Sequence, residues 1–366
     1  MSLRPRPEVD NLEVGLHGGP DVAELKAMGL TPESVLDFSV CANPFPPPSG
    51  VRAVLNTIAV NQYPDSQSTE YRQYLAVKLG VTADNILAGS GTTELIRLIA
   101  LTYFGHGDSV LILEPTFGEY RVATQIVGAE ILGQRGQEGD NFTLKVDDTI
   151  SFIRRHHPRG VFICNPNNPT GQYFSRGEVE GILDACRDGL LILDEAYISF
   201  VDGSWPSIDL IDHGNLVILR SLTKDYALAG LRLGYVVAGE EIIDALRRVC
   251  PPWNVNVVAQ QAGIAALNDR DYLEPCQREI AEAKRFLVAG IENIGFNTIP
   301  SRAHFFLVRV NNAKGFRAAL LKQGILVRDC TSFGLPEYVR ISARTMPECQ
   351  RLINTIQELK YQGGLK

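Results

Sequence analysis

Short apolar runs alternate with longer amphipathic segments through the middle of the chain. The segments YRQYLAVKLG (71–80) and TTELIRLIALTYF (92–104) space their apolar positions as helices do. Runs typical of short buried strands are VLILEP (110–115), GVFICNP (160–166), LLILDEAY (190–197), LVILRS (216–221) and GYVVAG (234–239). Such alternation predicts an α/β fold, with a mainly parallel central sheet flanked by helices.

The two ends of the chain have different patterns. The first fifty residues are rich in proline and glycine, so we expect an extended arm over residues 1–48. After PPWNVN (251–256), a long helical stretch (259–295) precedes a strand, HFFLVRV (304–310), and a final helix. We therefore predict a large domain over residues 49–250 and a smaller α+β domain over residues 251–366. The arm is expected to contribute to the small domain and to the active site.

Composition narrows the class of partner. The chain has 366 residues, enough for two domains, and a formal net charge of −7. This charge favours a small-molecule partner over nucleic acid or an anionic membrane. Without a membrane-spanning apolar segment or a secretory signal, we expect a cytoplasmic protein. The seven cysteines lack CxxC spacing, which predicts free, mostly buried thiols and no metal site.

Polar motifs follow three of the predicted strands at their carboxyl ends. NPNNPTG follows VFIC, DEAY follows LIL, and SLTK follows VILR. Parallel sheets bind ligands beyond these strand ends. The motifs therefore predict a site that contains Asn168, Asp194, Tyr197 and Lys224.

Lys224 stands among hydroxyl residues, eight positions before Arg232. A lysine can anchor an aldehyde covalently, and pyridoxal phosphate is the common aldehyde partner. This cofactor needs an acid at its ring nitrogen, for which Asp194 is suited, and donors at its ring oxygen, for which Tyr197 and Asn168 are suited. Its phosphate and ring face need further ligands, which we predict to be Ser221, Thr223, Arg232, the backbone amides of Gly91 and Thr92, and Phe117 stacked on the ring.

The sequence resembles fold-type I pyridoxal-phosphate enzymes, specifically the histidinol-phosphate aminotransferases and threonine-phosphate decarboxylases. The resemblance runs over nearly the whole chain and is most specific at NPNNPTG, LILDEAY and SLTKDYALAGLRLG. It implies that Lys224 is the Schiff-base lysine and that Asp194 pairs with the pyridine nitrogen. It also implies that Tyr197 and Asn168 contact the ring oxygen and that Thr223 and Arg232 hold the phosphate.

The same resemblance implies a homodimer with shared active sites. Tyr63, in NQYPDSQ, matches a tyrosine that reaches the cofactor phosphate of the neighbouring subunit. Arg340 matches the arginine that binds the substrate anion. Arg328, twelve positions earlier, is its expected partner, because a planar fork suits a carboxylate or a phosphate. Other substrate contacts are expected from His17 and Gly18 of the arm and from Asn168.

The choice of reaction depends on the arm. LHGGPDV followed by VLDFSVCANP resembles the decarboxylases, as do PPWNVN and LVRDC, whereas FGLPEYVRIS is shared with the aminotransferases. Pro20 stands where the decarboxylases often have asparagine. We therefore expect a lyase that decarboxylates L-threonine O-3-phosphate to aminopropanol phosphate, in cobalamin biosynthesis. The alternatives are a histidinol-phosphate aminotransferase that uses 2-oxoglutarate, in histidine biosynthesis, and a cofactor-binding protein without catalytic activity.

Overall fold

The computed structural model describes residues 3–10, 12, 15 and 17–365. Part of the predicted arm, at residues 1–2, 11, 13–14 and 16, therefore lies outside the described residues, as does residue 366 of the predicted small domain. The arm is not wholly extended, because it contains short helices, α1 (Pro7–Asp10) and α2 (Val22–Ala27). Asp21 caps α2 by accepting hydrogen bonds from the backbone amides of Ala23 and Glu24.

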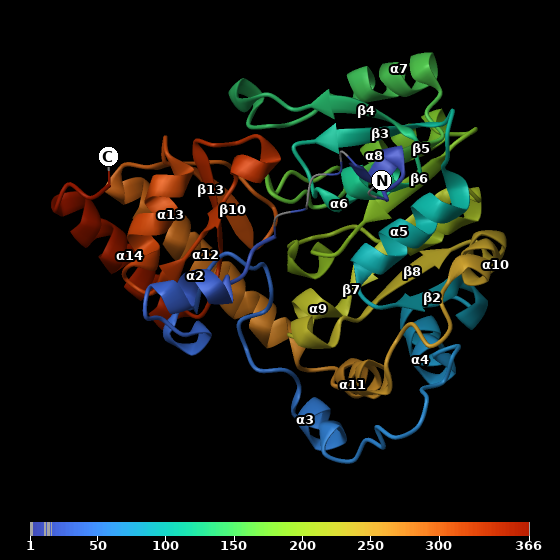
Figure 1. The fold of residues 1–366 in the computed structure, drawn as a ribbon, viewed down its shortest axis with the longest axis horizontal. Helices are drawn as coiled ribbons and strands as arrows, with labels where there is room; N and C mark the ends of the chain where they lie inside the picture. Colours follow the sequence, from blue (N-terminus) through green and yellow to red (C-terminus); the bar gives the residue numbers. More distant parts are fainter. Residues whose placement is uncertain (1–2, 11, 13–14, 16, 366) are drawn as a thin grey trace.

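A large sheet with helices on both faces forms the centre of the fold (Figure 1). Its strand order is β2-β8-β7-β6-β5-β3-β4. The strands are β2 (Ile86–Gly89), β3 (Ser109–Glu114), β4 (Glu130–Arg135), β5 (Gly160–Cys164), β6 (Leu190–Asp194), β7 (Leu216–Ser221) and β8 (Gly234–Ala238). Strands β3 to β7 pair in parallel, and β8 is antiparallel to both its neighbours. The mainly parallel sheet is confirmed, although β2 and β4 were not predicted.

The apolar runs are continuous because both faces of each central strand are buried. Leu191 and Leu193 of β6 lie in the core on one face of the sheet, and Ile192 lies in the core on the other face. Helices α3 (Ser49–Leu55), α4 (Thr69–Leu79), α7 (Val146–His156), α8 (Arg176–Ala185) and α11 (Val257–Asn268) cover the first face. Helices α5 (Thr92–Tyr103), α6 (Glu119–Ile126) and α10 (Glu240–Val249) cover the second.

A second, smaller sheet follows in the C-terminal part of the chain, with strand order β12-β13-β10-β9. Its strands are β9 (Asn297–Thr298), β10 (Phe305–Arg309), β12 (Arg328–Asp329) and β13 (Tyr338–Ser342), and its helices are α12 (Leu273–Ile294), α13 (Ala313–Leu321) and α14 (Met346–Tyr361). The arm joins this part, because β1 (Leu36–Asp37) pairs in parallel with β11 (Ile325–Leu326).

The position of helix α11 is relevant to the predicted domain boundary at residue 250. The helical stretch predicted over 259–295 is two helices, because the polar run NDRD at 268–271 competes with helical hydrogen bonding and separates α11 from α12. Although α11 follows residue 250, it packs against α3 and α4 beside the large sheet. The domain boundaries at residues 48 and 250 stay predictions.

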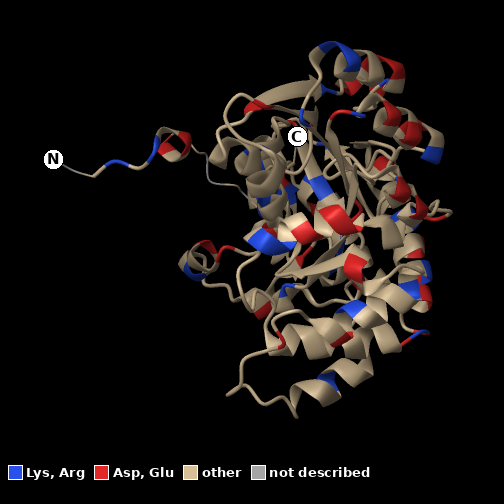
Figure 2. Cartoon of the chain, turned by 90° about the vertical axis from the view of Figure 1, so that its right-hand side faces the viewer, with Lys and Arg blue, Asp and Glu red and all other residues tan. Residues whose placement is uncertain are grey.

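The charged residues, the cysteines and the lengths of the helices bear on the class of protein. Acidic and basic residues are interspersed along the helices in Figure 2. All seven cysteines lie within the described residues, where they are free, and six of them are buried. Across residues 3–10, 12, 15 and 17–365, no helix has the length and apolar character that a bilayer crossing requires.

Candidate active site

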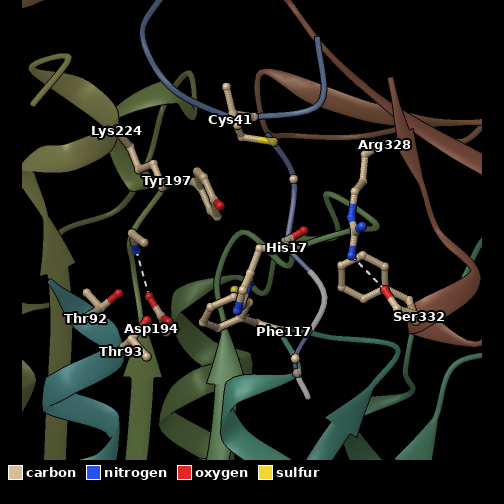
Figure 3. Close-up of a pocket in the computed structure, with 18 of the residues that line it drawn as sticks. His17, Cys41, Thr92, Thr93, Phe117, Asp194, Tyr197, Lys224, Arg328 and Ser332 are labelled. Atoms are coloured by element: carbon tan, nitrogen blue, oxygen red, sulfur yellow. Dashed lines mark hydrogen bonds between the residues drawn. The ribbon is translucent and has the colours of Figure 1, made fainter. Parts of the chain in front are cut away.

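A cavity of about 790 Å³ lies where the large sheet, the C-terminal sheet and the arm meet. Figure 3 shows Asp194 and Lys224 on one side of it, Arg328 on the other, and His17 and Phe117 between them. Of the residues predicted from the sequence, those lining the cavity are His17, Gly18, Thr92, Phe117, Asn168, Asp194, Tyr197, Thr223, Lys224, Arg232, Arg328 and Arg340. Residues from most of the chain length therefore converge on the carboxyl ends of the parallel strands.

Asp194 is a buried carboxylate, 3% exposed, at the end of β6. Its Oδ1 accepts a hydrogen bond from the Ala196 amide at 3.0 Å, and its Oδ2 accepts one from the Tyr120 hydroxyl at 2.7 Å. Burial raises the pKa of Asp194 to about 6, and the two hydrogen bonds oppose that rise. The carboxyl is therefore mainly ionised at neutral pH, although it is removed from water.

Lys224 lies in α9 (Leu222–Asp225), a single turn that follows β7. Its Nζ is 5.8 Å from the centre of the Tyr197 ring. Burial lowers the pKa of the Lys224 amine, and the positive charges of Arg340 and Arg232 lower it further. A larger share of this amine than of an exposed lysine is therefore neutral and nucleophilic near physiological pH.

Hydroxyls and backbone amides gather around the start of α9 and of α5. The hydroxyls of Ser221 and Thr223 are 2.6 Å apart and both are buried. Gly91 precedes the first turn of α5 with a φ of +79°, and a Cβ at this position would lie 2.7 Å from Nη2 of Arg232. Only glycine therefore lets the guanidinium come this close to the amino end of α5, which begins at Thr92.

Two arginines from the C-terminal sheet reach the same cavity. Arg328 and Arg340 are directly paired across β12 and β13. Arg340 is 4% exposed and donates hydrogen bonds to Asn168 Oδ1 and, at 2.6 Å, to the Ser39 carbonyl. Arg328 donates to the Ser332 hydroxyl at 2.7 Å (Figure 3). Both arginines therefore occupy paired positions of the small sheet and line the same cavity.

His17 is held at the cavity by residues at and just before the start of α6. Its Nε2 is 3.1 Å from Oε1 of Glu119, and its ring centre is 5.8 Å from that of Phe117. The hydrogen bond from His17 lowers the pKa of the buried Glu119 carboxyl, and Arg97 adds to this effect. Gly18 lies so close to the Ser39 carbonyl that a Cβ would be 2.5 Å from the oxygen.

Tyr63 is the predicted residue that lies apart from the others. It does not line the cavity of its own chain. Its ring is 80% exposed and stacks on Trp253, with ring centres 4.5 Å apart. A contact between Tyr63 and a cofactor would therefore require a second subunit.

Several residues that complete the site were missed by the sequence analysis. Tyr120 holds Asp194, Glu119 holds His17, and Ser39 holds Arg340. Asn43 contacts the turn that carries Lys224. A signal existed for Tyr120 and Glu119, because they follow Phe117 in the same EPTFGEY motif at the end of a strand.

The residues present fit pyridoxal phosphate. A carboxylate has about four lone-pair sites, and Asp194 uses two of them to bind Tyr120 and Ala196, which leaves room to accept a bond from a protonated ring nitrogen. Arg232, which lies against Gly91, and the adjacent hydroxyls of Ser221 and Thr223 are suited to a phosphate. Phe117 lines the cavity and can cover a flat ring.

Comparison with known proteins agrees with this fit. The sequence matches the family described as aminotransferase class I and II over residues 33–356. It is 34% identical over 343 residues to the histidinol-phosphate aminotransferase of Methanocaldococcus jannaschii, which covers 91% of each chain. The solved histidinol-phosphate aminotransferase of Sinorhizobium meliloti in complex with pyridoxal-5'-phosphate has a TM-score of 0.89, with 22% identity and 99% of each chain covered. The solved L-threonine-O-3-phosphate decarboxylase of Porphyromonas gingivalis has a TM-score of 0.77, with 25% identity, covering 88% of this chain and 99% of that one.

The first choice of reaction from the sequence, threonine-phosphate decarboxylation, is wrong on these comparisons. Curated relatives that are 32 to 35% identical over most of the chain are named histidinol-phosphate aminotransferase. The choice had depended on the HGG segment, and the contacts of His17 and Gly18 in the structure are with Glu119 and Ser39 of the protein itself.

Proposed function

The chain belongs to the class I and II aminotransferases, and from this we propose that it transfers an amino group between histidinol phosphate and 2-oxoglutarate. It is an enzyme that depends on pyridoxal phosphate. The main support for this proposal is that one cavity is lined by a buried carboxylate (Asp194), a lysine of lowered pKa (Lys224) and a pair of arginines (Arg328 and Arg340).

Pyridoxal phosphate, when bound, supplies an aldehyde that takes up the amino group and a protonated ring that accepts electrons from the substrate carbon. Asp194 holds the proton at the ring nitrogen, and its ionised state near neutral pH suits this role. Lys224, with a lowered pKa, would take the proton from the substrate carbon that bears the amino group and would deliver it to the carbon of the cofactor's aldehyde group. Asn168 and Tyr197 donate to the ring oxygen, and Tyr197 also limits the movement of the amine.

The arginines explain how one site can accept two different substrates. Histidinol phosphate carries a phosphate, and 2-oxoglutarate carries two carboxylates. Arg340, held in place by Asn168 and Ser39, offers a planar fork that suits either anion, and Arg328 lies beside it. His17 and Gly18 close the cavity from the arm.

The remaining ligands hold the cofactor itself. Ser221, Thr223 and Arg232, with the amides of Gly91 and Thr92, bind its phosphate, and Phe117 stacks on its ring. We also propose a homodimer in which Tyr63 reaches the partner's cavity. The exposed stack of Tyr63 on Trp253 supports this, because such rings are enriched at interfaces.

The test is product analysis by mass spectrometry of the cofactor-loaded enzyme. With histidinol phosphate and 2-oxoglutarate, we expect glutamate to form catalytically, and none should form without the keto acid. The Lys224→Ala variant, loaded with cofactor, should form glutamate at less than about a thousandth of the wild-type rate. Catalytic decarboxylation of L-threonine O-3-phosphate, with no glutamate in the first reaction, would overturn the proposal.

A further inference from the structure

The turn that carries Lys224 is too short to hold itself in place. Helix α9 has four residues, whereas isolated helices shorter than about 12 residues are marginal in water. The carbonyl groups at its end have no successors in the helix and need partners from elsewhere. The position of the Lys224 amine therefore depends on residues outside α9.

Asn43 of the arm supplies these partners. Its backbone amide donates to the Lys224 carbonyl at 2.7 Å, and its side-chain Nδ2 donates to the Asp225 carbonyl at 2.8 Å. One residue therefore binds the last two carbonyl groups of α9, although it lies 182 positions away from Asp225 in the sequence.

The Asn43 side chain is itself fixed. It is 5% exposed, and its Oδ1 accepts a hydrogen bond from the Phe45 amide at 3.0 Å. Its Nδ2 also donates to the Tyr272 hydroxyl at 3.2 Å, and this hydroxyl donates to the Pro46 carbonyl at 2.8 Å. Since Tyr272 directly precedes α12, Asn43 joins the arm, the start of α12 and the lysine-bearing turn.

The side chain of Asp225, at the end of the turn, is also held. The Ser199 hydroxyl donates to Asp225 Oδ2 at 3.0 Å, and Gln277 of α12 donates to the Ser199 carbonyl. The carboxylate of Asp225 and the carbonyls of α9 are thus bound by different elements. Loss of the Asn43 contacts would leave the Ser199 contact in place, so the turn would shift without detaching.

We propose that Asn43 is a positioning residue that fixes the end of α9 and thereby the point at which the Lys224 amine enters the cavity. The inference rests on the proposed role of Lys224 but not on the choice of substrate. A misplacement of about 1 Å at a reacting group can cost about 100-fold in rate. Because Asn43 is not among the residues that line the cavity, its effect should fall on proton transfer and leave substrate binding unchanged.

The test uses Asn43→Ala, which removes both side-chain donors and keeps the backbone amide. We expect kcat to fall about 10-fold or more, with KM for both substrates changed by less than about twofold. A second readout needs no cofactor: the pH dependence of Lys224 acylation in the cofactor-free protein, followed by peptide mass spectrometry. Its midpoint should move upward by about half a pH unit or more, because a loosened amine loses part of the burial that lowers its pKa.

Two further variants keep the test decisive. Tyr272→Phe removes the hydroxyl that holds the Asn43 amide, and it should shift both readouts in the same direction by less, even if Asn43→Ala does not fold. Asn85→Ala is the matched control, because Asn85 Nδ2 also donates to a backbone carbonyl, that of Ala238 at 3.1 Å, away from the cavity. It should leave both readouts unchanged.

The outcomes separate this inference from the proposed function. Wild-type kcat and an unchanged acylation midpoint in both Asn43→Ala and Tyr272→Phe would overturn it, as would equal effects in Asn85→Ala. A wild-type enzyme that fails to transfer the amino group would overturn the proposed function alone, because the acylation profile would still report how Asn43 positions Lys224.

Discussion

Removal of the Tyr120 hydroxyl should weaken cofactor binding in a pH-dependent way. Tyr120→Phe deletes the 2.7 Å hydrogen bond to Asp194 Oδ2 and keeps the ring that stacks on Phe162 with centres 4.7 Å apart. Packing should therefore change little. The carboxylate loses one of the two donors that oppose the effect of burial on its pKa.

The size of the effect follows from the energy of the lost bond. A hydrogen bond to a charged group contributes about 1.5 to 3 kcal/mol, and each pKa unit corresponds to about 1.4 kcal/mol. The pKa of Asp194 should therefore rise by about 1 to 2 units from its value of about 6. At pH 7 the ionised fraction falls from about nine-tenths to between about one-half and one-tenth.

The assay is titration of the cofactor-free protein with pyridoxal phosphate across a range of pH. If the ionised carboxylate binds the ring, the Kd of Tyr120→Phe should be about 2- to 10-fold higher than that of the wild type at pH 7. The ratio should shrink as the pH is raised towards about 9 and grow as it is lowered. A ratio that does not vary with pH would show that Tyr120 acts through packing, and the reasoning about Asp194 would be wrong.

Three other expectations follow from the same site. Arg340→Lys keeps the charge but loses the planar fork, so kcat/KM should fall about 100-fold for both substrates, and an unchanged kcat/KM would remove Arg340 from the anion site. Burial raises the folded-state pKa of Asp194 above its unfolded value, so the protonated carboxyl stabilises the folded protein. This contribution to the free energy of unfolding is fully present below about pH 4 and is lost as the pH rises to about 6. In chemical denaturation of the cofactor-free proteins, the stability of Asp194→Asn relative to the wild type should increase by about 3 kcal/mol over that range, and a pH-independent difference would contradict the raised pKa. If Tyr63 acts across a dimer, mixed Tyr63→Ala and Lys224→Ala subunits should regain up to about a quarter of wild-type activity, whereas a simple average of the parents would argue against a shared site.

The sequence was informative where structure depends on local pattern. Strand β6 begins with an unbroken apolar run because both of its faces are buried, and the alternation of such runs with helical segments predicted the parallel sheet. Asp194 is the last residue of such a strand, Lys224 lies just beyond another, and parallel strands end at the same edge of their sheet. Their convergence was therefore predictable without knowing the strand order.

The pattern of apolar and polar residues was less informative about which residues hold the side chains and turns of the site in place. Tyr120 meets Asp194 across 74 positions, Asn43 meets Asp225 across 182, and Ser39 meets Arg340 across 301. The first contact depends on how α6 packs against α5, β3 and β4, which places the Tyr120 ring on Phe162 of β5. The other two depend on where the arm runs after β1 pairs with β11.

The sequence by itself determined the alternating elements, the main sheet and the polar groups at its carboxyl edge, because apolar periodicity and strand-end motifs are local properties. Only the tertiary structure decided which side chains hold those groups, how strongly burial shifts the pKa values of Asp194 and Lys224, and that Tyr63 lies outside the cavity of its own chain. Burial and hydrogen bonding at one point depend on segments that are distant along the chain, and no local pattern records their packing.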